Sequence, residues 1–178
     1  MTRIEPFDKE ALRRRRRRTQ FWTAAVVLLA LAAVAAFFRD EFLVWRCARQ
    51  MREPGADRWA LMTRMVDAGP AGAKWVLREC RDGSPDGEVE LLVAEMLKDA
   101  PYDVYPYVDP LLTDDTPTTR AFAVTVVGHL RDARYRPRVE KLTADVAELP
   151  SGWTDRTVSI RARRALEEIV RQPSRDAP

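Results

Sequence analysis

An uncharged stretch of 20 residues, Thr19–Phe38, constrains the fold of this chain more than any other feature. It consists mainly of alanine, valine, leucine and phenylalanine, and as an α-helix it would be about 30 Å long, which matches the hydrocarbon thickness of a bilayer. Because backbone N–H and C=O groups find no water in lipid, such a stretch is stable there only as a helix. Trp22 and Trp45 stand near its two ends, where aromatic belts are expected. The stretch therefore predicts one transmembrane helix, since a domain of this size has no core wide enough to surround it.

Positive charge on the two flanks predicts the orientation of this helix. Eight arginines or lysines precede it, and they include the consecutive residues Arg13, Arg14, Arg15, Arg16, Arg17 and Arg18. Five arginines follow it between residues 39 and 58. Since the more basic flank stays in the cytoplasm, residues 1–18 are predicted to be a basic cytoplasmic segment in which the arginines act as a topology determinant and touch anionic headgroups. The rest of the chain is then extracytoplasmic, and periplasmic in a Gram-negative cell.

Removal of this stretch as a signal peptide is the alternative to a retained anchor. Ala33-Val34-Ala35 has the small-x-small form that signal peptidase reads. The apolar run continues beyond that point to Phe38, which favours a retained helix. From these residues alone, both outcomes stay open.

The distribution of charge along the chain bears on nucleic-acid binding. Residues 1–52 carry a net charge of +7 and residues 53–178 a net charge of −4, so the positive charge belongs to the anchor. A nucleic-acid-binding domain would concentrate positive charge on itself, and we therefore expect no nucleic-acid partner.

A disulfide between Cys47 and Cys80 is allowed outside the cytoplasm, while a free, apolar Cys80 is the simpler interpretation.

Prolines divide the remainder of the chain into helices. Proline suits the first position of a helix, and Ser84 and Thr116 stand before two of the prolines as N-caps. The helices are predicted at 57–68, 70–81, 86–99, 102–113, 117–131, 137–148 and 155–171, after a juxtamembrane helix and linker at 39–56 and before a disordered tail at 172–178. Pro106 and Pro110 predict that the helix at 102–113 is short or kinked.

These helices form pairs, and the pairs repeat. Leu97-Lys98-Asp99 recurs 33 residues later as Leu130-Arg131-Asp132, and Tyr107-Val108 is followed after 31 residues by Arg138-Val139. A single helical hairpin cannot bury its apolar face, so neighbouring hairpins must stack. The sequence therefore predicts an all-α chain in which one transmembrane helix precedes a short α-solenoid of three to four hairpins over residues 57–171.

The run Asp114–Asp132 resembles the HEAT repeats, in particular the short bacterial kind that is also found in phycobilin lyases. It is similar to the D-x5-R-x-x-A…L-G-x-L-x-D pattern of that family, and the resemblance covers about residues 57–170. It implies a polar ladder between adjacent repeats, formed here by Asp114, Arg120, Asp155 and Arg161. A carboxylate and a guanidinium six residues apart are also able to pair across a turn. Asp82 is followed six residues later by Glu88, so no ladder is expected there.

Residues with catalytic or ligating chemistry are sparse. His129 is the only histidine, in the solvent-facing slot of the G-x-L pattern, and no serine, cysteine or carboxylate stands at the spacing of a triad. Cys47, Cys80 and His129 lie on separate predicted elements, so we expect no metal site. Glycine-rich phosphate motifs are missing, and we expect no cofactor and no enzymatic activity.

Tyr102, Tyr105 and Tyr107 form a candidate surface for a protein or peptide partner, because tyrosine is enriched where proteins meet. The alternative is that they pack against neighbouring helices with their hydroxyl groups in water.

We expect a membrane-anchored scaffold or protein–protein interaction module, with the lipid bilayer and an unidentified protein as partners. Two alternatives stay open: a chromophore-handling lyase, implied by the resemblance alone, and a structural subunit of an envelope complex that assembles through Ala32, Ala33, Ala35 and Ala36.

Overall fold

The computed structural model describes residues 21–23, 26–32, 34 and 38–171, and the chain divides into two compact units, residues 1–39 and 40–178. In the first unit, residues 21–23, 26–32 and 34 are helical, and their side chains are exposed. The other residues of the predicted span, together with Arg13–Arg18 and the tail 172–178, lie outside the described residues. Among the residues that are described, no helix has the length and apolar character needed to cross a membrane.

The second unit is built from helices, and the all-α prediction is confirmed for the described part of the chain. One isolated antiparallel bridge joins Glu148 and Thr157, and no strand forms between residues 38 and 171. The elements are α2 (Arg39–Gln50), α3 (Arg58–Ala68), α4 (Pro70–Cys80), α5 (Glu88–Lys98), α6 (Tyr105–Val108), the 3-10 helix η1 (Asp109–Thr113), α7 (Pro117–Leu130), the 3-10 helix η2 (Ala133–Tyr135), α8 (Arg136–Leu142) and α9 (Val158–Arg171).

Local sequence features explain most of these boundaries. α4 and α7 begin at Pro70 and Pro117, as predicted. α5 begins two residues later than predicted because Gly87 adopts a left-handed conformation (φ 85°) just before it, and the Ser84 hydroxyl still accepts the N–H of Val89 at 3.2 Å. Thr116 occupies the N-cap position of α7 without a side-chain capping bond.

Two predicted segments are shorter in the structure. The expected short or kinked helix at 102–113 is confirmed, because α6 has four residues and passes directly into η1. The helix predicted at 137–148 is wrong in its second half, since α8 ends at Leu142 and the chain then forms a loop up to α9 at Val158. The hydrogen bonds of this loop include Leu149 N–H to the carbonyl of Arg156 at 2.9 Å.

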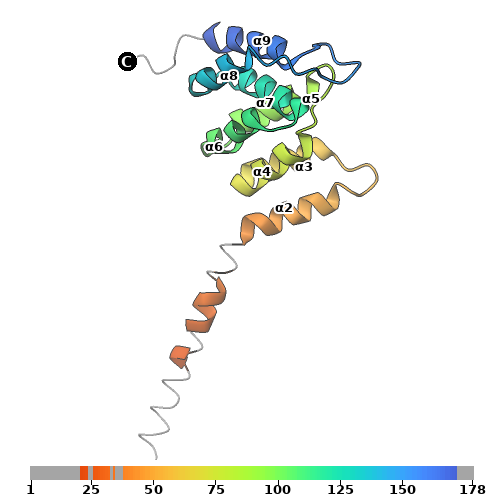
Figure 1. The fold of residues 1–178 in the computed structure, drawn as a ribbon. Coiled ribbons are helices and arrows are strands. Elements are labelled where there is room, and N and C mark those ends of the chain that lie inside the picture. Colours follow the sequence, from red (N-terminus) through yellow and green to blue (C-terminus); the bar gives the residue numbers. More distant parts are fainter. Residues whose placement is uncertain (1–20, 24–25, 33, 35–37, 172–178) are drawn as a thin grey trace, which may run out of the picture. The chain divides into compact units, whose positions relative to one another are not determined.

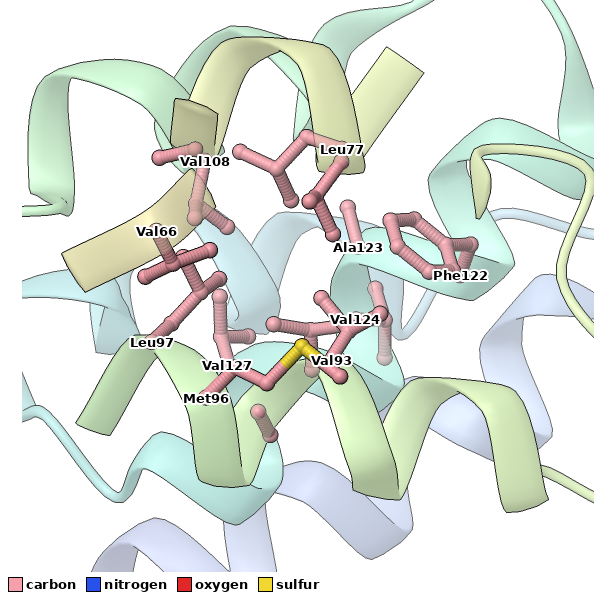
Figure 2. Close-up of a cluster of buried hydrophobic side chains, with 14 of the residues drawn as sticks. Val66, Leu77, Val93, Met96, Leu97, Val108, Phe122, Ala123, Val124 and Val127 are labelled. Carbon is pink, nitrogen blue, oxygen red and sulfur yellow. The ribbon is translucent and has the colours of Figure 1, made fainter. Parts of the chain in front are cut away.

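Helices that alternate along the chain lie against one another. α5 contacts α7 and α7 contacts α9, while α3 packs on α4 and α8 on α9 (Figure 1). The α7–α9 approach is close because Gly128 has no side chain: a Cβ atom there would lie 3.0 Å from the Cα of Ala165. Apolar side chains from α3, α4, α5, α6 and α7 meet in one cluster (Figure 2), among them Val66, Leu77, Val93, Val108 and Phe122.

α2 also belongs to this helical unit. Its residues Val44 and Cys47, with Met51 just after it, are buried in the same cluster as Met62 and Met65 of α3. The compact unit therefore starts at residue 40, earlier than the boundary at residue 57 that the sequence suggested. The stretch 39–56, predicted as a juxtamembrane helix and linker, contains a helix that is part of the core.

Candidate functional site

The most deeply buried charges of the described chain are Glu90 and Arg161, which form an ion pair. Glu90 lies in the first turn of α5 and is fully buried, and Arg161 lies in the first turn of α9 with its side chain 4% exposed. The guanidinium Nη1 is 2.7 Å from the Glu90 Oε1. Two charges taken out of water in this way need further hydrogen bonds to offset their desolvation.

Neighbouring groups supply these bonds for both charges. Arg161 Nη1 also donates to the Thr125 hydroxyl at 3.3 Å, and Nη2 donates to the carbonyl oxygens of Ser84 and Pro85 at 3.2 and 3.4 Å. Glu90 accepts the N–H and the hydroxyl of Ser84, at 3.2 and 2.7 Å. The guanidinium therefore connects α5, α7 and α9 through Nη1 and Nη2, while its buried Nε has no hydrogen-bond partner within the described residues and lies 3.4 Å from the Asp155 carboxylate.

A ring and a glycine shape the space around this pair. The Arg161 guanidinium carbon lies 4.5 Å from the ring centroid of Trp153, a cation–π contact with the loop before α9. Gly83 has φ 67°, and a Cβ atom there would lie 2.8 Å from the Glu90 Oε1 and 3.1 Å from the Trp153 ring. Glycine is required at this position on both counts.

The predicted ladder residues are only partly paired as expected. Asp155 lies 3.4 Å from the Arg161 Nε, so these two residues are brought together, although Asp155 is closer to Arg164 at 2.8 Å. The Arg120 guanidinium does not bond the Asp114 carboxylate, which instead accepts the N–H of Thr116 at 2.8 Å and stabilises the turn before α7. The predicted side-chain pair between Asp114 and Arg120 is therefore not formed.

Arg120 instead pairs with the carboxylate of Asp145, further along the chain. Its Nε is 2.7 Å from Asp145 Oδ2, and its Nη1 donates to the backbone carbonyls of Asp114 and Asp115 at 2.7 and 3.0 Å. Burial by itself raises the pKa of Asp145, but hydrogen bonds from Arg120 and from the N–H of Ala147 outweigh it and lower the pKa below its usual value. Asp145 follows Asp114 by 31 residues, the same spacing that relates Tyr107-Val108 to Arg138-Val139, and this spacing was the feature that could have identified the partner.

A second, exposed set of ion pairs joins two loops. Arg134 of η2 bonds Asp132 at 2.7 Å and Asp103, in the loop before α6, at 2.8 Å. These hydrogen bonds from Arg134 lower the pKa of Asp103. The arrangement connects positions 31 residues apart, which is close to the internal repeat length.

A pocket of about 290 Å³ lies beside the buried ion pair, lined by the start of α5 and by α7 and α9. His129 lines it, half-buried, rather than standing in a fully solvent-facing position, together with Thr154, Arg164 and Glu168. Besides Arg161, whose Nη1 and Nη2 bond the protein, the lining side chains that could reach a small molecule include these four and the exposed Asp86 carboxylate. They offer hydrogen bonds and charge of both signs. Within the described residues, no group of histidine, cysteine and acidic side chains is arranged to hold a metal ion.

The three predicted surface tyrosines are half-buried and make contacts within the chain. The Tyr102 hydroxyl donates to the carbonyls of Val66 and Gly69 at 2.8 and 3.0 Å, at the end of α3, and burial raises its pKa to about 12. Tyr107 lies edge-on to Tyr102, with the Lys74 ammonium 5.3 Å from its ring centroid.

The third tyrosine, Tyr105, stacks on the buried Tyr135 with ring centroids 4.8 Å apart, and Arg134 covers it. The three tyrosines therefore pack against neighbouring parts of the chain, which was the alternative to a partner surface. The difference is that the Tyr102 hydroxyl bonds backbone oxygens rather than water. What remains for a partner is the outer edge of Tyr105 and Tyr107.

Both cysteines are free thiols in the structure. Cys47 is buried in the core, and the Sγ atom of Cys80 lies 4.0 Å from the Met62 sulfur. Burial raises the pKa of Cys80 to about 11, which keeps it protonated and unreactive at neutral pH.

No family model, no curated protein and no solved structure matches this chain.

Proposed function

We propose that this protein is a single-pass membrane protein whose helical unit acts as a protein–protein interaction or scaffold module, with no catalytic activity of its own. The observation that carries the membrane part is a helical segment whose described apolar side chains are exposed. The large apolar side chains of this segment are 54–70% exposed, namely Phe21, Trp22, Val26, Val27, Leu28, Leu29, Leu31 and Val34. Exposed apolar side chains in such number are unfavourable in water and favourable in hydrocarbon.

Orientation follows from the flanking charge. The proposed span is residues 19–38, the arginine-rich residues 1–18 are cytoplasmic, and the helical unit lies on the extracytoplasmic side. In this arrangement the arginines Arg13–Arg18 lie next to the anionic inner leaflet.

Contacts between successive helical pairs support the repeat part of the proposal. α5, α7 and α9 contact one another in chain order, and the pairs Arg120–Asp145 and Arg134–Asp103 join positions 25 and 31 residues apart. A HEAT-like solenoid of three to four hairpins is the architecture that these contacts favour. Such stacks present extended surfaces to other proteins, which is why we propose a scaffold.

Carbonate extraction tests the anchor. The intact chain is expected to stay in the membrane pellet at alkaline pH, because an inserted helix is held by its apolar surface. The variant Leu28→Lys/Leu29→Lys is expected to be released, since each lysine at a helix centre costs about 2.5–3.5 kcal/mol of insertion free energy. Release of the intact chain would show that residues 19–38 are not a membrane span.

Site-specific photocrosslinking in cells tests the interaction surface. A photoreactive residue at Tyr107 is expected to capture a defined partner, whereas the same residue at Val146, on the exposed loop after α8, is not. With the probe at position 107, Tyr105→Ala should weaken the capture, and Tyr102→Phe, which alters only a buried hydrogen bond, should leave it. Identical products from positions 107 and 146 would remove the tyrosines from the proposal.

A further inference from the structure

α2 has two faces of different character. Val44 and Cys47 are buried in the core. The opposite side carries four exposed residues that we call the α2 outer face: Phe42, Trp45, Arg46 and Arg49. Their spacing of three, four and seven residues from Phe42 places them on one stripe of the helix. Phe42 is 62% and Trp45 56% exposed, so two large aromatic side chains have no cover within the described chain.

The side chains of this face are organised among themselves. The Phe42 and Trp45 rings stack with their centroids 5.7 Å apart, and the Arg49 guanidinium carbon lies 5.8 Å from the Trp45 centroid. The result is a continuous strip of aromatic surface that ends in positive charge. Tryptophan next to arginine suits the headgroup layer of a membrane, where the ring meets apolar chains and the guanidinium meets phosphate.

Covalent continuity places this strip close to the bilayer. Phe42 follows the proposed span by four residues, so its Cα lies at most about 14 Å from that of Phe38 even in a fully extended chain. The headgroup layer begins at that end of the span. A lipid surface is therefore within reach of the α2 outer face.

We propose that the α2 outer face binds the headgroup layer of an anionic bilayer, so that α2 lies on the membrane surface and carries the rest of the helical unit on its buried face. This inference rests on the proposed membrane anchor and adds the surface by which the unit meets the lipid. Positive charge at Arg46 and Arg49 selects anionic lipid over neutral lipid.

A spin label at position 53 distinguishes this arrangement from a helix that simply continues outward. If α2 extended the span along the membrane normal, residue 53 would stand about 22 Å beyond Phe38, in water. If α2 lies on the surface, the label lies at the headgroups. The full-length chain with Cys47→Ala, Cys80→Ala and Glu53→Cys is labelled with a nitroxide in phosphatidylcholine vesicles, with and without phosphatidylglycerol.

The expected result is high collision with oxygen and low collision with a water-soluble nickel chelate in the anionic vesicles. Arg46→Gln/Arg49→Gln should lower the ratio of docked to undocked label about 25-fold there, about fivefold for each arginine, and change little in neutral vesicles. Phe42→Ser/Trp45→Ser should release the label in both. As a matched control, Val146→Ser/Val170→Ser removes exposed apolar side chains elsewhere and should have no effect.

Three results would overturn the inference, and they are distinguishable. A label that stays in water while the chain resists carbonate would exclude docking of α2 and leave the anchor intact. Release of the chain by carbonate would remove the anchor and this inference together. Protection of the label that depends on protein concentration in detergent, without lipid, would assign the α2 outer face to a second copy of the chain. Circular dichroism of each variant confirms that the helices are retained.

Discussion

Arg161 connects three helices through a side chain that the solvent barely reaches. Its charge is matched by Glu90, which lies 71 residues earlier in the chain, and its Nη1 and Nη2 also bond the hydroxyl of Thr125 and the turn before α5. Removing one partner of such a pair leaves the other charge buried without compensation. Removing both leaves an apolar gap, which is far less costly.

Arg161→Leu is therefore expected to lower the free energy of unfolding by about 3–5 kcal/mol, and the double variant Glu90→Leu/Arg161→Leu by clearly less. Arg163→Leu serves as the control, because that side chain lies on the exposed side of the same helix and surface substitutions change stability little. Urea unfolding followed by circular dichroism measures all three. Equal losses for Arg161→Leu and Arg163→Leu would contradict a structural role for the buried pair.

Two tyrosine hydroxyl groups are expected to respond in opposite ways to removal. Tyr102→Phe loses the bonds to Val66 and Gly69 and should lower stability by about 1 kcal/mol. The Tyr135 hydroxyl is buried and has no hydrogen-bond partner within the described residues, so Tyr135→Phe should leave stability unchanged or raise it by up to about 1 kcal/mol. Thermal or urea unfolding of the two variants, side by side, checks the contrast. A larger loss for Tyr135→Phe would show that this hydroxyl has a partner.

The Arg120–Asp145 pair is expected to stabilise the fold only above acidic pH. The pKa of Asp145 in the folded state is lower than its usual value of 3.8, so its contribution is present above that value and is lost as the pH falls through the folded pKa. Asp145→Asn should be less stable than the parent at about pH 7, and the difference should vanish at about pH 2. Asp115→Asn, at an exposed neighbour of Asp114, is the control. A difference that persists in acid would argue against the charge as its cause.

At the level of elements, α7 and α9 pack closely against each other. The absence of a side chain at Gly128 allows the Ala165 backbone to approach, and the two helices bury Val124, Val127 and Ala162 near this crossing. Interiors of this density do not accept additional atoms without movement of the backbone or of neighbouring side chains.

Gly128→Val is expected to separate the two helices and to lower stability by about 1–3 kcal/mol. Arg163→Val places the same side chain on the exposed side of α9 and should cost less than about 1 kcal/mol, which isolates the effect of packing from that of helix propensity. Ala165→Gly combined with Gly128→Val should recover part of the loss. If both single valine variants behave alike, the close approach is not what glycine provides.

For the whole molecule, the distribution of charge along the chain predicts its topology. A reporter that is active only in the cytoplasm is expected to be inactive when fused to the C-terminus and active when fused to the N-terminus. Substituting Gln for Arg13–Arg18 leaves two cations before the span against five after it, and should therefore favour the reverse orientation. Full activity of the C-terminal fusion in the parent chain would reverse the assigned orientation.

Sequence alone determined the class of the fold and most of the helix ends in the second unit. Proline at the start of α4 and α7 and the prolines in 102–113 act on the backbone within one or two turns, so a local pattern is sufficient to place them. The C-terminal half of 137–148 was the exception. Its residues bond instead to the chain at the start of α9, as in the hydrogen bond from Val158 N–H to the Ala147 carbonyl. Helix propensity along the sequence does not account for such tertiary hydrogen bonds, which compete with those of a helix.

Only the tertiary structure decided which charged and polar groups meet. Glu90 and Arg161 are far apart in sequence, Asp145 replaced Asp114 as the carboxylate of Arg120, and the Tyr102 hydroxyl capped a helix from a different pair. These partners depend on which helices stack and at what distance, and that is set by apolar packing across the whole unit. A pattern read along the chain contains no information on that distance, which is why it proposed charged residues for a ladder but not the partners that Arg120 and Arg161 have in the structure.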